Sequence, residues 1–295
     1  MILVLGASSY VGKHIYAYLG GTEAMGTHNK NPLPHTVHFD SARMCIPELG
    51  LRPNEVSHAF ICFGETRMDE CKTNADQSYE LNVSRTKRVI DDLVSANIKP
   101  IFFSSDYVFD GTKGNYSEND APNPITAYGA HKYEVERYLS DHYSDYLILR
   151  LSKIIGSESG DGRLPSIWHQ QIQRGEEVCC DDEQSFSPIH IEDVVAAATA
   201  AVKLDLSGLF NLGGGESVTR VELFRRLRFI LAVDTNLTRC SISDFDFEDN
   251  RPLDISLDSR KILAATNLEF KSIDSSCREF ADSVSKDQPK AKTRT

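Results

Sequence analysis

Tyr128 and Lys132 have the residue types and the spacing that proton transfer needs. Residues four apart in a helix lie on one face, one turn from each other. Because an ammonium beside a phenol stabilises the phenolate, we expect Lys132 to lower the pKa of Tyr128 from about 10 toward the working pH. Tyr128 could then give a proton to a carbonyl oxygen or take one from an alcohol. Taken alone, the pair is better explained as an ordinary surface pair on a helix.

Two serines, Ser104 and Ser105, follow a predicted strand at 101–103. In open α/β sheets, ligands bind beyond the carboxyl ends of the strands. A serine hydroxyl at that edge can hydrogen-bond the reacting oxygen beside Tyr128. Strand-end serine, tyrosine and lysine, behind a phosphate-binding loop, form a far more specific combination than the Tyr–Lys pair alone.

That loop is predicted at residues 6–12, between an N-terminal strand at 2–5 and a helix at 11–19. Gly6 permits a tight turn, and Gly12 lets the helix pack closely on the strand. The helix N-terminus offers free N–H groups to a pyrophosphate. Ser9 stands where such loops usually have a second glycine; its Cβ narrows the approach to phosphate, although its hydroxyl could donate a hydrogen bond. The alternative is an ordinary strand-to-helix turn.

Residues 25–30 occupy the region where dinucleotide-binding folds end their second strand, and they bear on the choice of cofactor. NAD-preferring loops usually place an acid there to bind the ribose 2′-hydroxyl, and residues 25–30 contain none. Thr27, Asn29 and Lys30, with His28 among them, could hold a 2′-phosphate instead, which favours NADP(H) over NAD(H). The alternative is a solvated loop. Asp40 could meet the adenine amine or simply cap a surface turn.

The order of expected elements indicates the fold. Strands at 2–5, 36–39, 56–63, 101–103 and 146–151 alternate with helices at 11–19, 74–96 and 125–142, and helices at 191–204 and 218–231 flank a strand at 208–212. This order predicts an α/β protein with a Rossmann-type doubly wound parallel sheet and a smaller α/β substrate-binding lobe. We assign 1–156 to the NAD(P)-binding domain, with 188–215 returning to it. The lobe takes 157–187 and 216–285, and 286–295 are expected to be a disordered tail.

Composition excludes several classes of protein. The 295 residues carry a net charge of -11 and no long Lys/Arg cluster, so nucleic acid is an unexpected partner. No apolar run approaches the roughly 18 residues that a membrane-spanning helix needs. An anionic ligand remains compatible with this acidity if backbone N–H groups build its site locally.

The seven cysteines have irregular spacing, form no CxxC and follow no signal peptide. We therefore expect reduced thiols in a cytoplasmic protein. Cys179 and Cys180 are better explained as part of a half-buried strand than as a redox pair. The nine histidines show no metal-ligand spacing, so no metal-binding residue is assigned.

Several segments together carry a family resemblance. Residues 103–111 read Phe-Ser-Ser-Asp-Tyr-Val-Phe-Asp-Gly, followed by 116–124 and by Tyr128-Gly129 and Lys132. Residues 63–71, 81–83, 187–194 and 251–254 provide further landmarks. The chain resembles the extended short-chain dehydrogenase/reductase family, and more narrowly its dTDP-4-dehydrorhamnose reductase branch, over roughly residues 1–265.

The resemblance implies hydride transfer from NADPH to the keto carbon of a nucleotide-linked 4-keto-6-deoxysugar, in a possible homodimer. Tyr128 would be the proton donor, Lys132 would also hold the nicotinamide ribose, and Ser105 matches the catalytic Ser/Thr position, with Ser104 as the fallback. Cofactor contacts would come from Gly6, Ser8, Ser9, Tyr10, Val11, Gly12, Cys62, Phe63 and Gly64. Substrate contacts would come from Thr66, Arg67, Ser104, Val108, Phe109 and Lys153.

Two departures from the branch leave other functions open. Lys153 replaces an aromatic platform over the substrate, and Arg67 stands at a usually apolar position. Two added positive charges suggest a different, anionic substrate. The alternatives are an epimerase or dehydratase of the same family, or a non-catalytic regulatory subunit that binds a dinucleotide.

Overall fold

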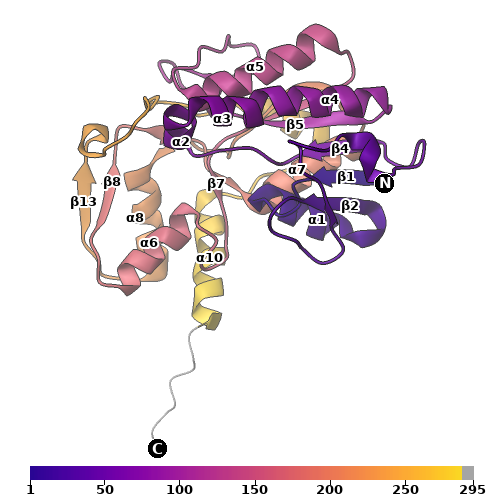
Figure 1. Cartoon of the computed structure of the whole chain (residues 1–295). Coiled ribbons are helices and arrows are strands. Elements are labelled where there is room, and N and C mark those ends of the chain that lie inside the picture. The colour runs from indigo at the N-terminus through magenta and orange to yellow at the C-terminus, as the bar shows by residue number, and fades with distance from the viewer. Residues whose placement is uncertain (288–295) are drawn as a thin grey trace, which may run out of the picture.

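The computed structural model describes residues 1–287, which form a seven-stranded sheet beside a smaller lobe (Figure 1). The strand order is β11-β6-β5-β4-β1-β2-β3, and every neighbouring pair is parallel. The strands are β1 (Ile2–Leu5), β2 (Ala24–His28), β3 (Val37–His38), β4 (His58–Ile61), β5 (Lys99–Ser105), β6 (Leu147–Leu151) and β11 (Gly208–Leu212). The predicted doubly wound parallel sheet is confirmed. Strand order reverses between β1 and β4, which is where such sheets open a crevice for ligands.

Helices cover both faces of this sheet (Figure 1). Helices α1 (Tyr10–Glu23) and α7 (Ile191–Lys203) cover one face, and α4 (Arg85–Ser95) and α5 (Ala127–His142) cover the other. Adjacent residues of a strand point to opposite faces, so Val4 packs in the cluster with α1 and α7 whereas Leu3 packs in the cluster with α4 and α5. Burial on both faces explains the continuous apolar runs of these strands.

The segment from 74 to 96 was expected to be one helix, and it is continuously helical from 75 to 95 with a π-helical turn inside it. It comprises α3 (Ala75–Tyr79), a π-helical turn at Glu80–Ser84, and α4, and it follows the short helix α2 (Met68–Thr73). In the π turn, the Asn82 side chain donates to the carbonyl of Glu65 at 2.9 Å and accepts from the Glu65 amide at 2.7 Å. This double contact holds the loop that follows β4.

The smaller lobe has its own buried cluster, in which Trp168 meets Phe224 edge to face at 5.3 Å. Its helices are α6 (Leu164–Gln173), α8 (Arg220–Leu231) and α10 (Ile273–Asp287). Two two-stranded sheets complete it: β9 (Ser185–Phe186) with β12 (Val218–Thr219), and β8 (Val178–Asp181) with β13 (Leu237–Cys240). A third pair, β7 (Ile154–Ile155) with β10 (Ile189–His190), lies in the range assigned to the NAD(P)-binding domain, and its Ile189 packs in the cluster of the main sheet. Helix α9 (Arg260–Thr266) lies within the range assigned to the lobe, yet Ile262 packs in the cluster under the main sheet. The domain boundaries remain an interpretation.

Three local expectations were wrong. The strand expected at 36–39 is only the edge strand β3, and both of its residues are exposed rather than buried. Helix α8 begins at Arg220, two residues later than expected, because Val218 and Thr219 pair with β9. Helix α10 extends to Asp287, so residues 286 and 287 are helical; the remainder of the expected tail, 288–295, lies outside the described residues. Between residues 1 and 287, no helix is long and apolar enough to cross a bilayer.

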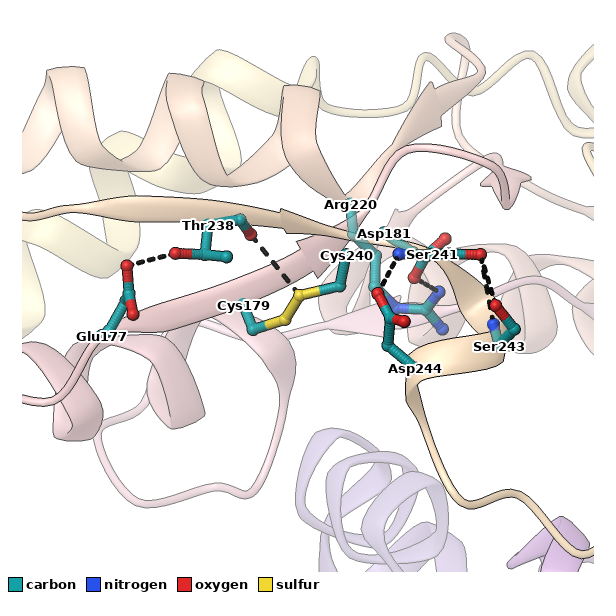
Figure 2. Close-up of a disulfide and its surroundings, with 9 residues drawn as sticks. All are labelled: Glu177, Cys179, Asp181, Arg220, Thr238, Cys240, Ser241, Ser243 and Asp244. Atoms are coloured by element: carbon teal, nitrogen blue, oxygen red, sulfur yellow. Dashed lines mark hydrogen bonds and ion pairs between the residues drawn. A yellow bond between two sulfur atoms is a disulfide. The ribbon is translucent and has the colours of Figure 1, made fainter.

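The expectation that all cysteines are reduced is corrected at one pair. Cys179 of β8 and Cys240 of β13 form a disulfide (Figure 2). These residues are 61 positions apart in the chain, and only the parallel pairing of β8 with β13 brings them together. Cys180 points to the opposite face of β8 and is buried, as alternation along a strand requires. The vicinal cysteines therefore lie on a half-buried strand, as predicted, and do not pair with each other.

Candidate functional site

A cavity of about 330 Å³ lies beyond the carboxyl ends of β1, β4 and β5, beside helix α5. It brings together most of the residues that the sequence assigned to chemistry. The assigned residues that line it are Ser9, Tyr10, Val11, Cys62, Phe63, Gly64, Thr66, Ser104, Ser105, Tyr128, Lys132 and Lys153. A wider hollow of about 940 Å³ lies elsewhere on the lobe, between α8 and β13, and contains none of these residues.

The loop between β1 and α1 has the geometry of a phosphate cradle. Gly6 has a φ of 81°, which a residue with a side chain rarely adopts. A Cβ on Gly12 would collide with the carbonyl oxygen of Gly6 and lie 2.8 Å from the Ser9 hydroxyl. Ser9 caps the helix by accepting a hydrogen bond from the Gly12 amide at 3.1 Å. The amides of Tyr10 and Val11 have no carbonyl partner one turn earlier within α1, so they are available to an anion.

The residues predicted to recognise a 2′-phosphate divide into two groups. Thr27 is buried, and its hydroxyl accepts a hydrogen bond from the Gly6 amide at 3.1 Å, so its position supports the loop rather than a ligand contact. Asn29 and Lys30 are exposed at the end of β2, and His28 contacts the Thr36 hydroxyl at 2.8 Å. Asp40 caps a turn by accepting from the Ala42 amide at 2.9 Å, which is the alternative that the sequence left open for it.

Helix α5 presents Tyr128 and Lys132 to the cavity. The helix starts at this point because the Thr126 hydroxyl accepts from the Gly129 amide at 2.9 Å. The Lys132 ammonium donates to the carbonyl of Phe103 at 2.8 Å and lies 5.7 Å from the centre of the Tyr128 ring. The Ser105 hydroxyl donates to the buried carboxylate of Asp106 at 2.9 Å. Ser105, Tyr128 and Lys132 therefore line one cavity, with an additional carboxylate beside them.

The predicted depression of the Tyr128 pKa is wrong for this environment. Burial, and next the negative charge of Asp106, hold the pKa of Tyr128 above its ordinary value, against the opposing effect of the Ser105 hydroxyl. Burial also lowers the pKa of Lys132 to about 8, because desolvation disfavours the charged form of either group. The phenol therefore remains protonated through neutral pH, which is the state that a proton donor requires.

Three residues assigned to the substrate lie outside the cavity. Arg67 is turned to the surface, where it pairs with Glu65 at 2.9 Å and Glu70 at 3.4 Å. Val108 and Phe109 are fully buried in a separate apolar cluster, in which Phe109 stacks on Tyr116 at 4.0 Å. Neither residue lines this cavity, so the substrate contacts expected of them are not formed here. Ser8, Gly6 and Gly12 shape the loop without lining the cavity.

Tertiary structure adds residues that the sequence analysis did not assign. Arg163 comes from the loop before α6, Gln184 from the turn between β8 and β9, and Phe186 from β9 itself. Arg220 opens α8, Ile255 lies in the segment before α9, and Asp106 directly follows β5. One signal was available in advance. Thr219 and Glu222 form a capping box, a pattern that marks a helix start and so places Arg220 in a first turn.

The structure also groups three residues of metal-binding type. Ligand atoms of His190, Glu192 and Glu279 all lie within 4.8 Å of one another. However, the ammonium of Lys271 lies 2.6 Å from Glu192 and 2.7 Å from Glu279. A resident lysine already supplies the positive charge that these carboxylates need, so the group requires no metal.

Comparison with known proteins shows the family and the fold. The family model described as "RmlD substrate binding domain" matches residues 1–286. The chain is 28% identical to methionine adenosyltransferase 2 subunit beta of Danio rerio, over 75% of this chain and 71% of that protein. It is also 28% identical to the probable low-salt glycan biosynthesis reductase Agl14 of Haloferax volcanii, over 67% of each. The fold superimposes on the Bacillus anthracis dTDP-4-dehydrorhamnose reductase, solved in complex with NADP, with a TM-score of 0.82 and 20% identity, covering 95% and 97% of the two chains.

Proposed function

This chain belongs to the family described as "RmlD substrate binding domain", and we propose that it is an NADPH-dependent reductase of a keto group on a nucleotide-linked sugar. A single observation carries the proposal. Ser105, Tyr128 and Lys132 line the same cavity as the first turn of α1, which has the backbone geometry of a phosphate cradle. The family resemblance implies that the sugar of the substrate is a 4-keto-6-deoxysugar.

Each residue has a part in this reaction. When bound, NADPH would supply the hydride for the keto carbon. Tyr128 gives its phenolic proton to the keto oxygen, and the product is an alcohol. The Ser105 hydroxyl orients that oxygen, and Lys132, buried and tied to the carbonyl of Phe103, binds the nicotinamide ribose.

We propose NADPH rather than NADH because the residues at the end of β2 include a lysine and no acid. Residues 25–30 contain no acid that could bind a 2′-hydroxyl, and Asn29 and Lys30 are exposed at the end of that strand. A lysine and an amide can bind a 2′-phosphate. The Bacillus anthracis relative in complex with NADP supports the same choice.

A second candidate is a regulatory subunit that binds a dinucleotide without turnover. It is favoured by the similarity to methionine adenosyltransferase 2 subunit beta over 75% of the chain. A dehydratase is less well supported, because family members of that kind resemble one another in an Asp-Glu pair that the strand-end sequence Ser104-Ser105-Asp106 lacks. An epimerase is less well supported because such enzymes retain NAD, whereas residues 25–30 contain no acid that would favour NAD. A cytoplasmic location and a homodimer remain predictions.

Replacement of Tyr128 by phenylalanine separates these candidates. For a reductase we expect NADPH oxidation with nucleotide keto-sugars to fall about 10²- to 10⁴-fold, while fluorescence titration shows unchanged NADPH binding. Tyr18→Phe is the matched control, because Tyr18 is exposed on α1, away from the cavity. Full turnover in Tyr128→Phe contradicts the mechanism. NADPH binding without turnover on any keto-sugar favours the regulatory subunit, and preferential binding of NADH contradicts the cofactor assignment.

A further inference from the structure

The cavity has the opposite charge balance to the whole protein. The chain carries a net charge of -11, yet four cationic side chains line the cavity, from Lys132, Lys153, Arg163 and Arg220, against the single carboxylate of Asp106. Two of these cations lie on the side of the phosphate loop and the catalytic tyrosine. Lys132 donates to a backbone carbonyl, and Arg163 stacks on the Tyr10 ring of the phosphate loop at 3.8 Å, although its buried Nε has no hydrogen-bond partner. Lys153 and Arg220 remain on the substrate side.

Lys153 is a half-buried cation without a partner. Throughout residues 1–287, its ammonium makes no hydrogen bond or ion pair with another side chain or with the backbone. Burial, and next the charge of Arg220, lower the pKa of Lys153 to about 8, against the opposing effect of Asp106. An uncompensated charge in such a position is unfavourable unless a ligand supplies the counter-charge.

Arg220 is held in place from outside the cavity. Its guanidinium donates to the carboxylate of Asp181 at 2.6 Å (Figure 2) and lies 5.7 Å from the centre of the Phe186 ring. This single contact uses one edge of the planar guanidinium. The other N–H groups of Arg220 remain available to an acceptor in the cavity.

Register places Lys153 close to the reacting atoms. Leu151 is the strand partner of Ser105, so Lys153 follows that pairing by two residues, about 7 Å along an extended chain. The keto oxygen must lie against Ser105 and Tyr128. A substituent on a ring carbon next to the keto carbon can reach Lys153 over this distance of about 7 Å. The diphosphate is attached across the ring from the keto carbon, so it leads away from Lys153.

We propose that Lys153, supported by Arg220, binds a carboxylate carried by the sugar ring, so that the substrate class is a nucleotide-linked keto-sugar acid. This inference rests on the proposed reductase function and narrows it. The carboxylate passes through the reaction unchanged: the hydride goes to the keto carbon, the proton from Tyr128 goes to its oxygen, and no bond to the carboxyl group is made or broken. Lys153 acts as a specificity residue.

The test compares two probes that differ only in this group. UDP-glucuronic acid and UDP-glucose, and the corresponding dTDP pair, are titrated into the full-length protein saturated with NADP⁺ and followed by calorimetry. We expect the acid to bind about tenfold or more tightly than the neutral sugar, the difference expected for a charge-assisted contact. Lys153→Met should abolish this preference, and Lys72→Met should retain it, because Lys72 is an exposed cation on α2 outside the cavity.

Each alternative result has a defined meaning. Equal affinity of the wild-type protein for acid and neutral sugar overturns the inference, as does failure of every probe to bind. Equal weakening of both probes by Lys153→Met assigns the lysine to the shared diphosphate and also overturns it. Turnover of a neutral keto-sugar that depends on Tyr128, without preference for the acid, leaves the reductase proposal intact while the carboxylate subsite fails.

Discussion

The guanidinium of Arg220 and the carboxylate of Asp181 form an ion pair at 2.6 Å that joins helix α8 to strand β8. Asp181 is nearly fully buried and also accepts a hydrogen bond from the Gln184 amide at 2.9 Å. Two residues earlier on the same strand, Cys179 is linked to Cys240 of β13 (Figure 2). A crosslinked strand pair thus holds the residue that positions a cation of the cavity.

Asp181→Asn tests this positioning. The amide keeps an oxygen for the Gln184 amide but loses the charge that orients Arg220. We expect the KM for the sugar substrate to rise about five- to tenfold, since an oriented charged contact is worth roughly 1–1.5 kcal/mol. NADPH affinity should remain unchanged. Asp182→Asn is the control, because Asp182 pairs with Arg239 on the exposed side of the strand pair; an equal effect there contradicts the positioning role.

Thiol counting tests the crosslink. The structure has five free cysteines, Cys45, Cys62, Cys71, Cys180 and Cys277, whereas the sequence has seven. Protein denatured without reductant should therefore react with five equivalents of a thiol reagent, and with seven after reduction. Loss of the link through Cys179→Ser and Cys240→Ser should lower the free energy of unfolding by about 2–4 kcal/mol. Seven reactive thiols before reduction would show that the protein carries no such bond.

Gly12→Ala tests the phosphate loop. A methyl group at this position would meet the carbonyl oxygen of Gly6 and the Ser9 hydroxyl, so the loop or the helix must shift. We expect the free energy of unfolding to fall by about 1–3 kcal/mol, together with a clear loss of NADPH affinity in fluorescence titration. Gly21→Ala provides the comparison, because a Cβ there meets nothing within 4 Å and should change stability by less than about 1 kcal/mol. Unchanged NADPH binding in Gly12→Ala contradicts the loop assignment.

The buried ion pair that joins α5 to β6 makes a stability prediction. Glu136 of α5 binds Arg150 of β6 at 2.9 and 2.6 Å, with both side chains at most 5% exposed. Glu136→Gln leaves the arginine charge buried without its counter-charge, so urea unfolding should show a loss of about 3–5 kcal/mol. Arg137→Gln, which removes an exposed pair with Asp141 at 3.7 Å, should cost at most about 1 kcal/mol. Similar losses for both variants would contradict this account.

The pH dependence of acid binding follows from Lys153. Burial lowers its pKa to about 8, with Arg220, Arg163 and Arg251 acting in the same direction and Asp106 against them. The lysine is therefore charged below about pH 8 and loses its charge as the pH rises through that value. Burial raises the pKa of Asp106 to about 7, so this carboxylate gains negative charge over the same interval. Affinity for UDP-glucuronic acid should fall between pH 7 and 9, as both changes disfavour a carboxylate.

The matched measurements are UDP-glucose, whose binding should vary much less over this interval, and Lys153→Met. In Lys153→Met, the affinity for UDP-glucuronic acid should decline less above pH 8, because the titrating lysine is absent. A decline of equal size for the neutral sugar would assign the titration to another part of the site.

The sequence determined those parts of the protein that depend on short-range order. Gly6, Ser9 and Gly12 lie within seven residues of one another, and the geometry of their turn follows from the absence of a Cβ and the presence of a capping hydroxyl. Tyr128 and Lys132 are four residues apart, so they share a helix face whether that face is buried or exposed. The alternation of strands and helices was sufficient to predict a parallel sheet. It also predicted that the candidate site lies at the carboxyl ends of its strands.

Tertiary structure decided which side chains face the cavity and how they ionise. The packing of α8 and of the loop before α6 brought Arg220 and Arg163 to a site more than thirty residues away in sequence from Tyr128, and the pairing of β8 with β13 joined Cys179 to Cys240. Arg67, Val108 and Phe109 share motifs with true cavity residues but point elsewhere. The pKa of Tyr128 departed from the sequence expectation because the free energy of desolvation depends on everything packed around a group, whereas residue spacing reports only its neighbours along the chain.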